Sequence, residues 1–154
     1  MNSGVEVQRA CAAPGIPAAA KLVEWAEAAL DGRSEGAHMT VRVVDETEGA
    51  ALNARYRGRT GATNVLAFGF DAPEAPSVRI LGDIVVCAPV AAREAHEHAK
   101  RPDAHWAHLV VHGTLHLLGY DHDELDAAGE MEALEREILA RLGYPDPYAD
   151  EVGS

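Results

Sequence analysis

The feature that most constrains this chain is the run HGTLHLLGYDH at residues 112–122. Residues four apart lie on the same face of a helix, so His112 and His116 can direct both imidazoles at one metal ion. Gly119 permits a left-handed turn that ends the helix, and this turn would return His122 as a third ligand. Three neutral nitrogens and one open position form the ligand set of a catalytic zinc. The run therefore predicts a metal-dependent hydrolase that holds one zinc ion per chain.

Two further histidines precede this run at helical spacing. His105, His108 and His112 fall on one stripe of the predicted helix. Three ligands already complete an open zinc site. We therefore interpret His105 and His108 as residues that support the ligands without binding the metal, or that lie at the rim of the site. Asp121 either orients His122 by accepting its free N–H or only occupies a turn, and the sequence leaves both interpretations open.

The histidine spacing also matches a zinc-peptidase pattern, H-E-x-x-H-x-x-G-x-x-H, in which the Glu is the general base. Gly113 stands at that position here. A peptidase would therefore need a carboxylate from elsewhere in the chain. The reaction is expected to depend instead on the metal, which lowers the pKa of bound water towards about 7 and polarises a phosphoryl oxygen, and on nearby positive charge.

The charge distribution offers a source of that positive charge. The formal net charge is −12, which by itself disfavours nucleic-acid binding. Residues 49–70, however, contain Arg55, Arg57 and Arg59 and no Asp or Glu. These arginines either contact phosphate, whose geometry a guanidinium matches, or form a solvated helix end. The local absence of acids favours phosphate contact.

Hydrophobic periodicity and turn residues predict a single domain over residues 1–154. The fold class is α+β, with a small mixed four-stranded sheet packed with about five helices and a metal site on a core helix and its following turn. Strands are expected at 5–11, 38–44, 65–70 and 80–88, and helices at 18–30, 45–56, 89–100, 103–118 and 123–142.

The two cysteines, Cys11 and Cys87, lie far apart in no ligand-like spacing, so no disulfide framework is expected. The first residues lack the apolar core of a signal peptide, and no run of 18 apolar residues exists. We therefore expect a cytoplasmic protein that does not enter a membrane.

Taken together, these residues resemble the YbeY family of bacterial rRNA maturation factors. The pattern H-G-x-L-H-L-x-G-Y-D-H is matched throughout residues 112–122. Four shorter segments are also similar to family motifs: LNARYR at 52–57, TNVLAF at 63–68, LGDI at 81–84 and HWAH at 105–108. The sequence departs at Ala67, where the family usually has Ser, and at Gly69, where Pro is common.

The resemblance implies a zinc ion held by His112, His116 and His122, and a functionally important arginine at Arg57. It implies a zinc-dependent, single-strand-specific endoribonuclease that processes the 3′ end of 16S rRNA and takes part in ribosome maturation and quality control. The expected partners are single-stranded rRNA precursor and proteins of the small ribosomal subunit. Two alternatives remain: an assembly factor whose zinc is mainly structural, and a metal hydrolase of a non-RNA substrate.

Overall fold

The computed structural model describes residues 4–12, 15–31, 37–58, 61, 63–69, 80–120 and 125–148. Within these ranges, the side chains of Arg57, Ile80 and residues 125–128 lie outside the description. The predicted Arg59, Asp121 and His122 lie outside the described residues. No described helix has the length and apolar character needed to cross a membrane.

A mixed four-stranded sheet forms the centre of the fold, as predicted. Its strands are β1 (Gly4–Arg9), β2 (His38–Val44), β3 (Val65–Gly69) and β4 (Ile80–Cys87), in the order β1-β2-β4-β3. β1, β2 and β4 run parallel to one another, and β3 pairs antiparallel with β4. β4 is a central strand with side chains packed on both of its faces, so its apolar run at 84–87 is buried.

Five helices are found among the described residues. They are α1 (Ala19–Leu30), α2 (Glu46–Arg57), α3 (Ala88–Glu97), α4 (Pro102–Leu117) and α5 (Leu125–Leu142). The predicted start of α2 is confirmed, since the Asp45 side chain accepts a 2.8 Å hydrogen bond from the Glu48 N–H. The helix ends at Gly58, whose φ of 66° is left-handed.

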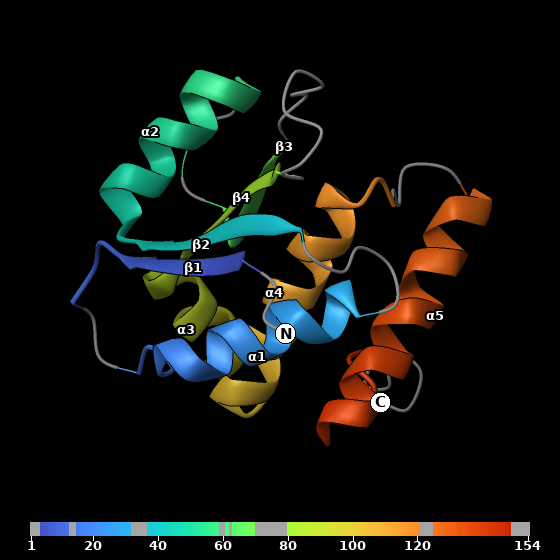
Figure 1. Ribbon diagram of the computed structural model, residues 1–154. Coiled ribbons are helices and arrows are strands. Elements are labelled where there is room, and N and C mark those ends of the chain that lie inside the picture. The colour runs from blue at the N-terminus through green and yellow to red at the C-terminus, as the bar shows by residue number, and fades with distance from the viewer. Residues whose placement is uncertain are drawn as a thin grey trace.

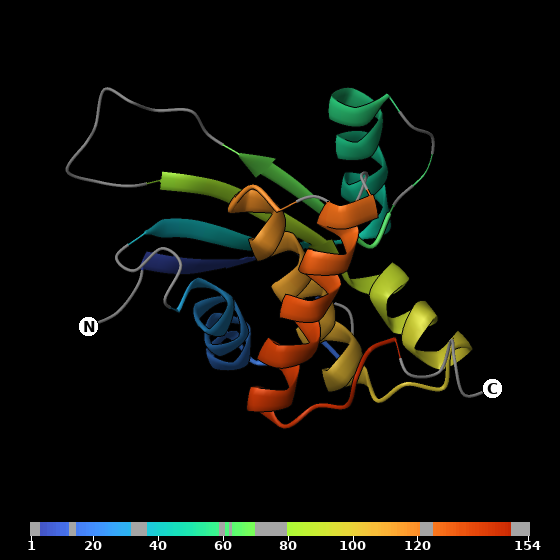
Figure 2. The same cartoon turned by 90° about the vertical axis from the view of Figure 1, so that its right-hand side faces the viewer.

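The helices cover both faces of the sheet. α2 lies over one face, while α1 and α4 lie against the other, and α5 packs beside α4 on the side away from the strands (Figures 1 and 2). The larger core lies between the sheet and the α1–α4 layer, where Trp25, Trp106 and Ile84 are almost fully buried. α4 is thus enclosed between the sheet and α5.

The two sides of α4 differ in polarity. Trp106, Val110 and Val111 are at most 2% exposed and form the core side, while Leu117 and Leu118 are partly buried against the same core. The histidine stripe lies on the other side of the helix. The core side of α4 therefore fixes the direction in which the histidines point.

Gly113 lies where α4 packs closely against the sheet. A Cβ at this position would lie 3.0 Å from Cγ2 of Ile84 and 3.2 Å from Cγ2 of Val65. Position 113 therefore faces the packed strands. This explains why the peptidase-like spacing lacks its glutamate: a glutamate at position 113 would overlap the core.

Gly119 ends α4 as predicted. Its φ is 101°, a conformation that favours glycine. Its N–H donates to the His116 carbonyl at 3.0 Å, and the Tyr120 N–H donates to the Leu115 carbonyl at 3.1 Å. These bonds end the helix at Leu117, one residue after His116, as a Schellman-type ending does.

The packing at Gly113 makes a testable prediction. An alanine normally stabilises a helix interior by roughly 0.5–1 kcal/mol relative to glycine. At Gly113 the added methyl group meets the buried Ile84, and overpacking of this kind costs roughly 1–3 kcal/mol. We expect Gly113→Ala to lower the free energy of unfolding by about 1 kcal/mol, as measured by urea denaturation.

Gly129 in α5 provides the matched control, because a Cβ there would meet no atom within 4 Å. Gly129→Ala should raise the free energy of unfolding by roughly 0.5–1 kcal/mol. Equal stabilisation by the two substitutions would contradict the close approach of α4 to the sheet.

Candidate metal centre

Successive turns of α4 bring the predicted ligands His112 and His116 together. Their ring centroids lie 4.9 Å apart, and the ring planes are inclined by 75°. His108, one turn earlier, has its ring centroid 6.1 Å from that of His112. The structure therefore places the two described histidines of the predicted ligand set side by side, close to the turn at Gly119.

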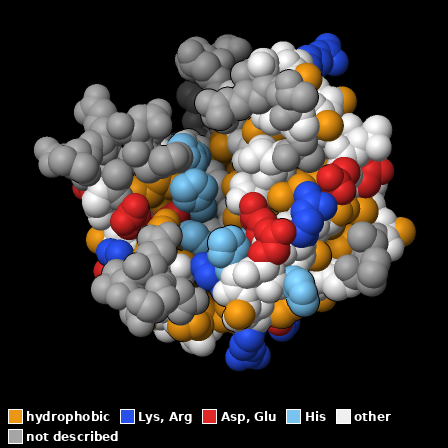
Figure 3. All heavy atoms as spheres, turned by 180° about the vertical axis from the view of Figure 1, so that it is seen from behind, with side chains coloured by type: hydrophobic (Ala, Val, Ile, Leu, Met, Phe, Trp, Pro, Cys, Tyr) orange, Lys and Arg blue, Asp and Glu red, His pale blue; other side chains and the backbone are white. Residues whose placement is uncertain are grey.

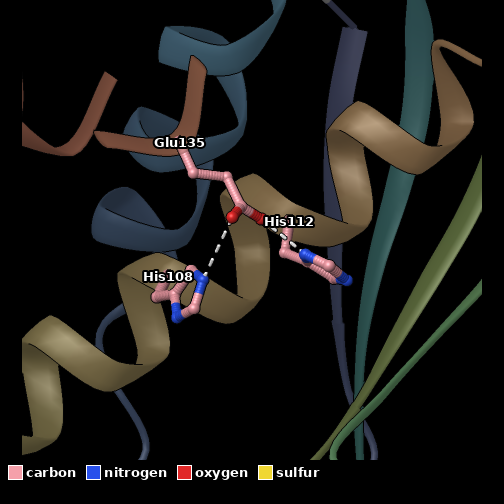
Figure 4. Close-up of side chains that lie close together, drawn as sticks. All are labelled: His108, His112 and Glu135. Atoms are coloured by element: carbon pink, nitrogen blue, oxygen red, sulfur yellow. Dashed lines mark hydrogen bonds and ion pairs between the residues drawn. The ribbon is translucent and has the colours of Figure 1, made fainter. Parts of the chain in front are cut away.

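A buried carboxylate on α5, which the sequence interpretation did not include, contacts this row. Glu135 is 0% exposed. Its Oε2 lies 2.5 Å from Nδ1 of His112, and its Oε1 lies 3.5 Å from Nε2 of His108 (Figure 4). The Tyr148 hydroxyl donates a hydrogen bond to Oε1. The carboxylate thus joins α4, α5 and the segment after α5.

The sequence does contain a signal for Glu135. In α5 it follows Met131 by four residues and precedes Ile138 and Leu139 by three and four, and all three of these residues are buried. Glu135 therefore occupies a core position of an amphipathic helix. A carboxylate at such a position needs buried donors, which is a reason to look for a functional partner.

The electrostatics of Glu135 favour its ionised form. Burial by itself would raise the pKa of the carboxyl, but hydrogen bonds and charge interactions with His108 and His112 outweigh it. They lower the pKa of Glu135 from an ordinary 4.5 to about 2. An ionised carboxylate only accepts hydrogen bonds, so the proton between Glu135 and His112 belongs to Nδ1 of the histidine.

Glu135, His108 and His112 also form a group whose ligand atoms lie within 4.8 Å of one another, which is close enough to surround a metal ion. With bonds of about 2.0–2.1 Å, two ligands of one tetrahedral zinc stand about 3.3 Å apart. The 2.5 Å between Oε2 of Glu135 and Nδ1 of His112 is shorter than this and corresponds to a short hydrogen bond. The geometry of this pair fits a carboxylate that supports a metal-binding histidine.

His105 belongs to a separate polar network at the start of α4. Its Nε2 lies 3.0 Å from Oε1 of Glu94, and Nδ2 of Asn64 donates to the same oxygen at 3.1 Å. Burial would raise the pKa of Glu94, but hydrogen bonds from His105 and Asn64 outweigh it and leave the pKa lowered. His105 thus connects α4 to α3 and to the start of β3.

A pocket of about 360 Å³ lies beside the histidine row. Figure 3 shows histidine side chains gathered along a hollow of this face. The pocket is formed by the end of α3, the first half of α4, the residue before β3 and the segment after α5. It is lined by Asn64, Glu94, His98, Lys100, His105, His108, Leu109, Pro147 and Tyr148.

Two of the three predicted arginines, Arg55 and Arg57, lie at the end of α2. Arg55 is exposed, and its guanidinium carbon lies 5.3 Å from the centroid of the Tyr56 ring. Tyr56 is 56% exposed and contacts Phe68 of β3 edge-on, with 5.1 Å between the ring centroids. Arg57 is the last residue of α2. The end of α2 therefore presents arginine beside an exposed aromatic ring.

Comparison with known proteins identifies close relatives of this chain. Residues 15–143 match the family model described as "Endoribonuclease YbeY". Proteins with this name from Stutzerimonas stutzeri and Nitrosococcus oceani are 55% and 51% identical to the chain. Each alignment covers 96% of this chain, and 93% and 98% of the respective relative.

A solved structure shares the fold. The solution structure of a Thermotoga maritima protein matches with a TM-score of 0.58, at 23% sequence identity. The match covers 90% of this chain and 91% of the other. The α+β arrangement described above therefore occurs in an experimentally determined structure.

The Glu94 network predicts a pH dependence of stability. Because the pKa of Glu94 is lower in the folded protein, its contribution is present above the unfolded pKa of about 4.3 and is lost as the pH falls through the folded pKa. Wild type should therefore be more stable than Glu94→Gln at pH 7, and the difference should shrink below about pH 4.3. Urea denaturation of both proteins at several pH values measures this difference in stability.

Glu97→Gln, at an exposed position of the same helix, is the control. A stability difference between wild type and Glu94→Gln that does not change with pH would contradict the role given to the Glu94 carboxylate.

Proposed function

This chain belongs to the YbeY endoribonuclease family, and we propose that it is a zinc-dependent, single-strand-specific endoribonuclease that matures the 3′ end of 16S rRNA. The observation that carries the metal assignment is the pair His112 and His116, whose rings lie side by side above the turn at Gly119. His122, in the segment that follows, completes the proposed ligand set for one zinc ion per chain. Zinc, when bound, supplies positive charge and a water whose pKa falls towards about 7.

In this proposal, arginine supplies the remaining positive charge. Arg57 stabilises the negative charge that develops on the scissile phosphate, a task for which a planar guanidinium is suited. Arg55 and Arg59 contact the RNA backbone on either side. The absence of acidic residues from 49–70 supports this role, because no carboxylate in that segment competes for the arginines.

Specificity for single strands is supported by the end of α2. The exposed Tyr56 ring stands beside Arg55. Single-stranded nucleic acids are commonly bound by arginines that follow the backbone and aromatic rings on which bases stack. We assign Tyr56 the role of stacking on an unpaired base next to the cleavage site.

A peptide hydrolase is less compatible with this geometry. Such an enzyme needs a carboxylate base beside the metal-bound water. Position 113 faces the strands, and Glu135 contacts the Nδ1 edge of His112, with Tyr148 donating to its other oxygen.

The proposed location of the enzyme is the cytoplasm, with small-subunit ribosomal proteins as partners during maturation.

Removing the metal or a ligand tests the proposal. His112→Ala, His116→Ala and chelator-treated wild type should each reduce cleavage of single-stranded RNA to background, and zinc should restore only the chelated wild type. His96→Ala removes an exposed histidine of α3 and should cleave at the wild-type rate. Equal cleavage by all these samples would indicate a contaminating nuclease and contradict the metal role.

Folded but inactive wild type that binds zinc would favour the assembly-factor alternative. In that case His116→Ala should unfold the domain, as circular dichroism would show, because a structural metal contributes folding free energy.

Substitutions at the end of α2 should separate catalysis from binding. Arg57→Ala should lower kcat by roughly 100-fold, because a group that stabilises the transition-state charge is lost. Tyr56→Ala should weaken RNA affinity about tenfold, whereas Tyr56→Phe should retain it. The measurements are single-turnover cleavage and fluorescence anisotropy with a single-stranded oligonucleotide.

Arg93→Ala removes an exposed positive charge on α3 and serves as the control for net charge. If Arg93→Ala and Arg57→Ala reduced cleavage equally, the effect would be nonspecific electrostatics rather than contact at the site.

A further inference from the structure

Glu135 is positioned to fix the orientation and proton of one metal ligand. Its Oε2 accepts from Nδ1 of His112, and the ring of His112 separates that contact from Nε2, which points away from Glu135 (Figure 4). We propose that Glu135 is the positioning residue of the metal centre: it holds His112 in the Nδ1–H form so that Nε2 binds the metal. This inference rests on the zinc site proposed above.

Burial makes this contact rigid. Glu135 is 0% exposed, and its neighbours along α5, Met131, Ile138 and Leu139, are at most 1% exposed. A side chain enclosed in this way has little freedom to leave its rotamer. The carboxylate therefore fixes the orientation of the His112 imidazole through Nδ1, the nitrogen that does not bind the metal, as carboxylates do in many zinc sites.

The other oxygen of Glu135 is held by a chain of donors. The Tyr148 hydroxyl gives its single hydrogen to Oε1 of Glu135. It lies 3.3 Å from Nε2 of His108, so the bond between these two groups requires His108 to donate. Because Tyr148 donates to Oε1, the Glu135 carboxylate acts as an acceptor on both oxygens. Nδ1 of His112 is therefore the donor to Oε2.

Tyr148 is itself fixed by its surroundings. Its N–H donates to Asp146 at 2.8 Å, and the guanidinium carbon of Arg136 lies 5.2 Å from its ring centroid. Its ring also contacts that of His108, with centroids 5.4 Å apart. The segment after α5 therefore anchors Glu135, and through it His112, although it follows the histidine run by more than twenty residues.

This arrangement predicts the effect of three substitutions on zinc affinity. Glu135→Leu removes the acceptor and should weaken zinc binding by about 10- to 100-fold. Glu135→Gln keeps an oxygen that can accept from Nδ1 and should lose less. Glu137→Gln, an exposed position of α5, makes the same charge change and should bind like wild type. Affinity is measured by competition with a chromophoric chelator.

The protonation of His112 gives a second readout, which a merely structural role of Glu135 would not move. In the neutral form of His112, ¹⁵N NMR of the zinc-free protein should show the ring proton on Nδ1. Glu135→Gln should retain this form, and Glu135→Leu should show a mixture. The wild-type spectrum decides the question even where Glu135→Leu fails to fold.

Two results would overturn the inference. One is wild-type His112 protonated on Nε2. The other is zinc binding that is lost in His108→Ala but kept in His116→Ala, which would make Glu135 and His108 metal ligands. Failure of the proposed function would look different: zinc affinity and the His112 proton would follow the prediction, while the zinc-loaded wild type would not cleave RNA.

Discussion

The contact between a buried carboxylate and the central helix organises this protein. Glu135 of α5 has no exposure to solvent, and its oxygens accept from His112 of α4 and from Tyr148. An ionised carboxylate is costly to bury unless hydrogen-bond donors fill its acceptor sites. α4, α5 and the segment after α5 must therefore pack together around Glu135. The orientation of α4, and with it the histidine row, depends on this packing.

The opposite side of α4 is constrained as tightly. Gly113 allows the helix to approach Ile84 and Val65 without space for a side chain. One side of α4 thus has no space for a carboxylate side chain, whereas the other side packs against the buried carboxylate of Glu135. This division explains how a histidine spacing shared with zinc peptidases can occur without their general base, and why the proposed chemistry combines a metal with arginine.

Much of the fold could be predicted from local patterns. The strands, the helices, the cap at Asp45 and the helix end at Gly119 all follow from periodicity and turn chemistry, which act over a few residues. The adjacency of His112 and His116 also follows, because helix geometry fixes it. Glu135 could not be assigned in this way, since its contact with His112 depends on how α5 packs on α4. Its place among Met131, Ile138 and Leu139 was the local sign.

The position of the bound metal in the folded protein is the most direct test of the role proposed for Glu135. Anomalous diffraction at the zinc edge from crystals of the zinc-loaded protein locates the ion without reference to activity. We predict one peak on the Nε2 side of His112, shared with His116, with Glu135 still on Nδ1. A peak enclosed by His108, Glu135 and Nδ1 of His112 would contradict the account.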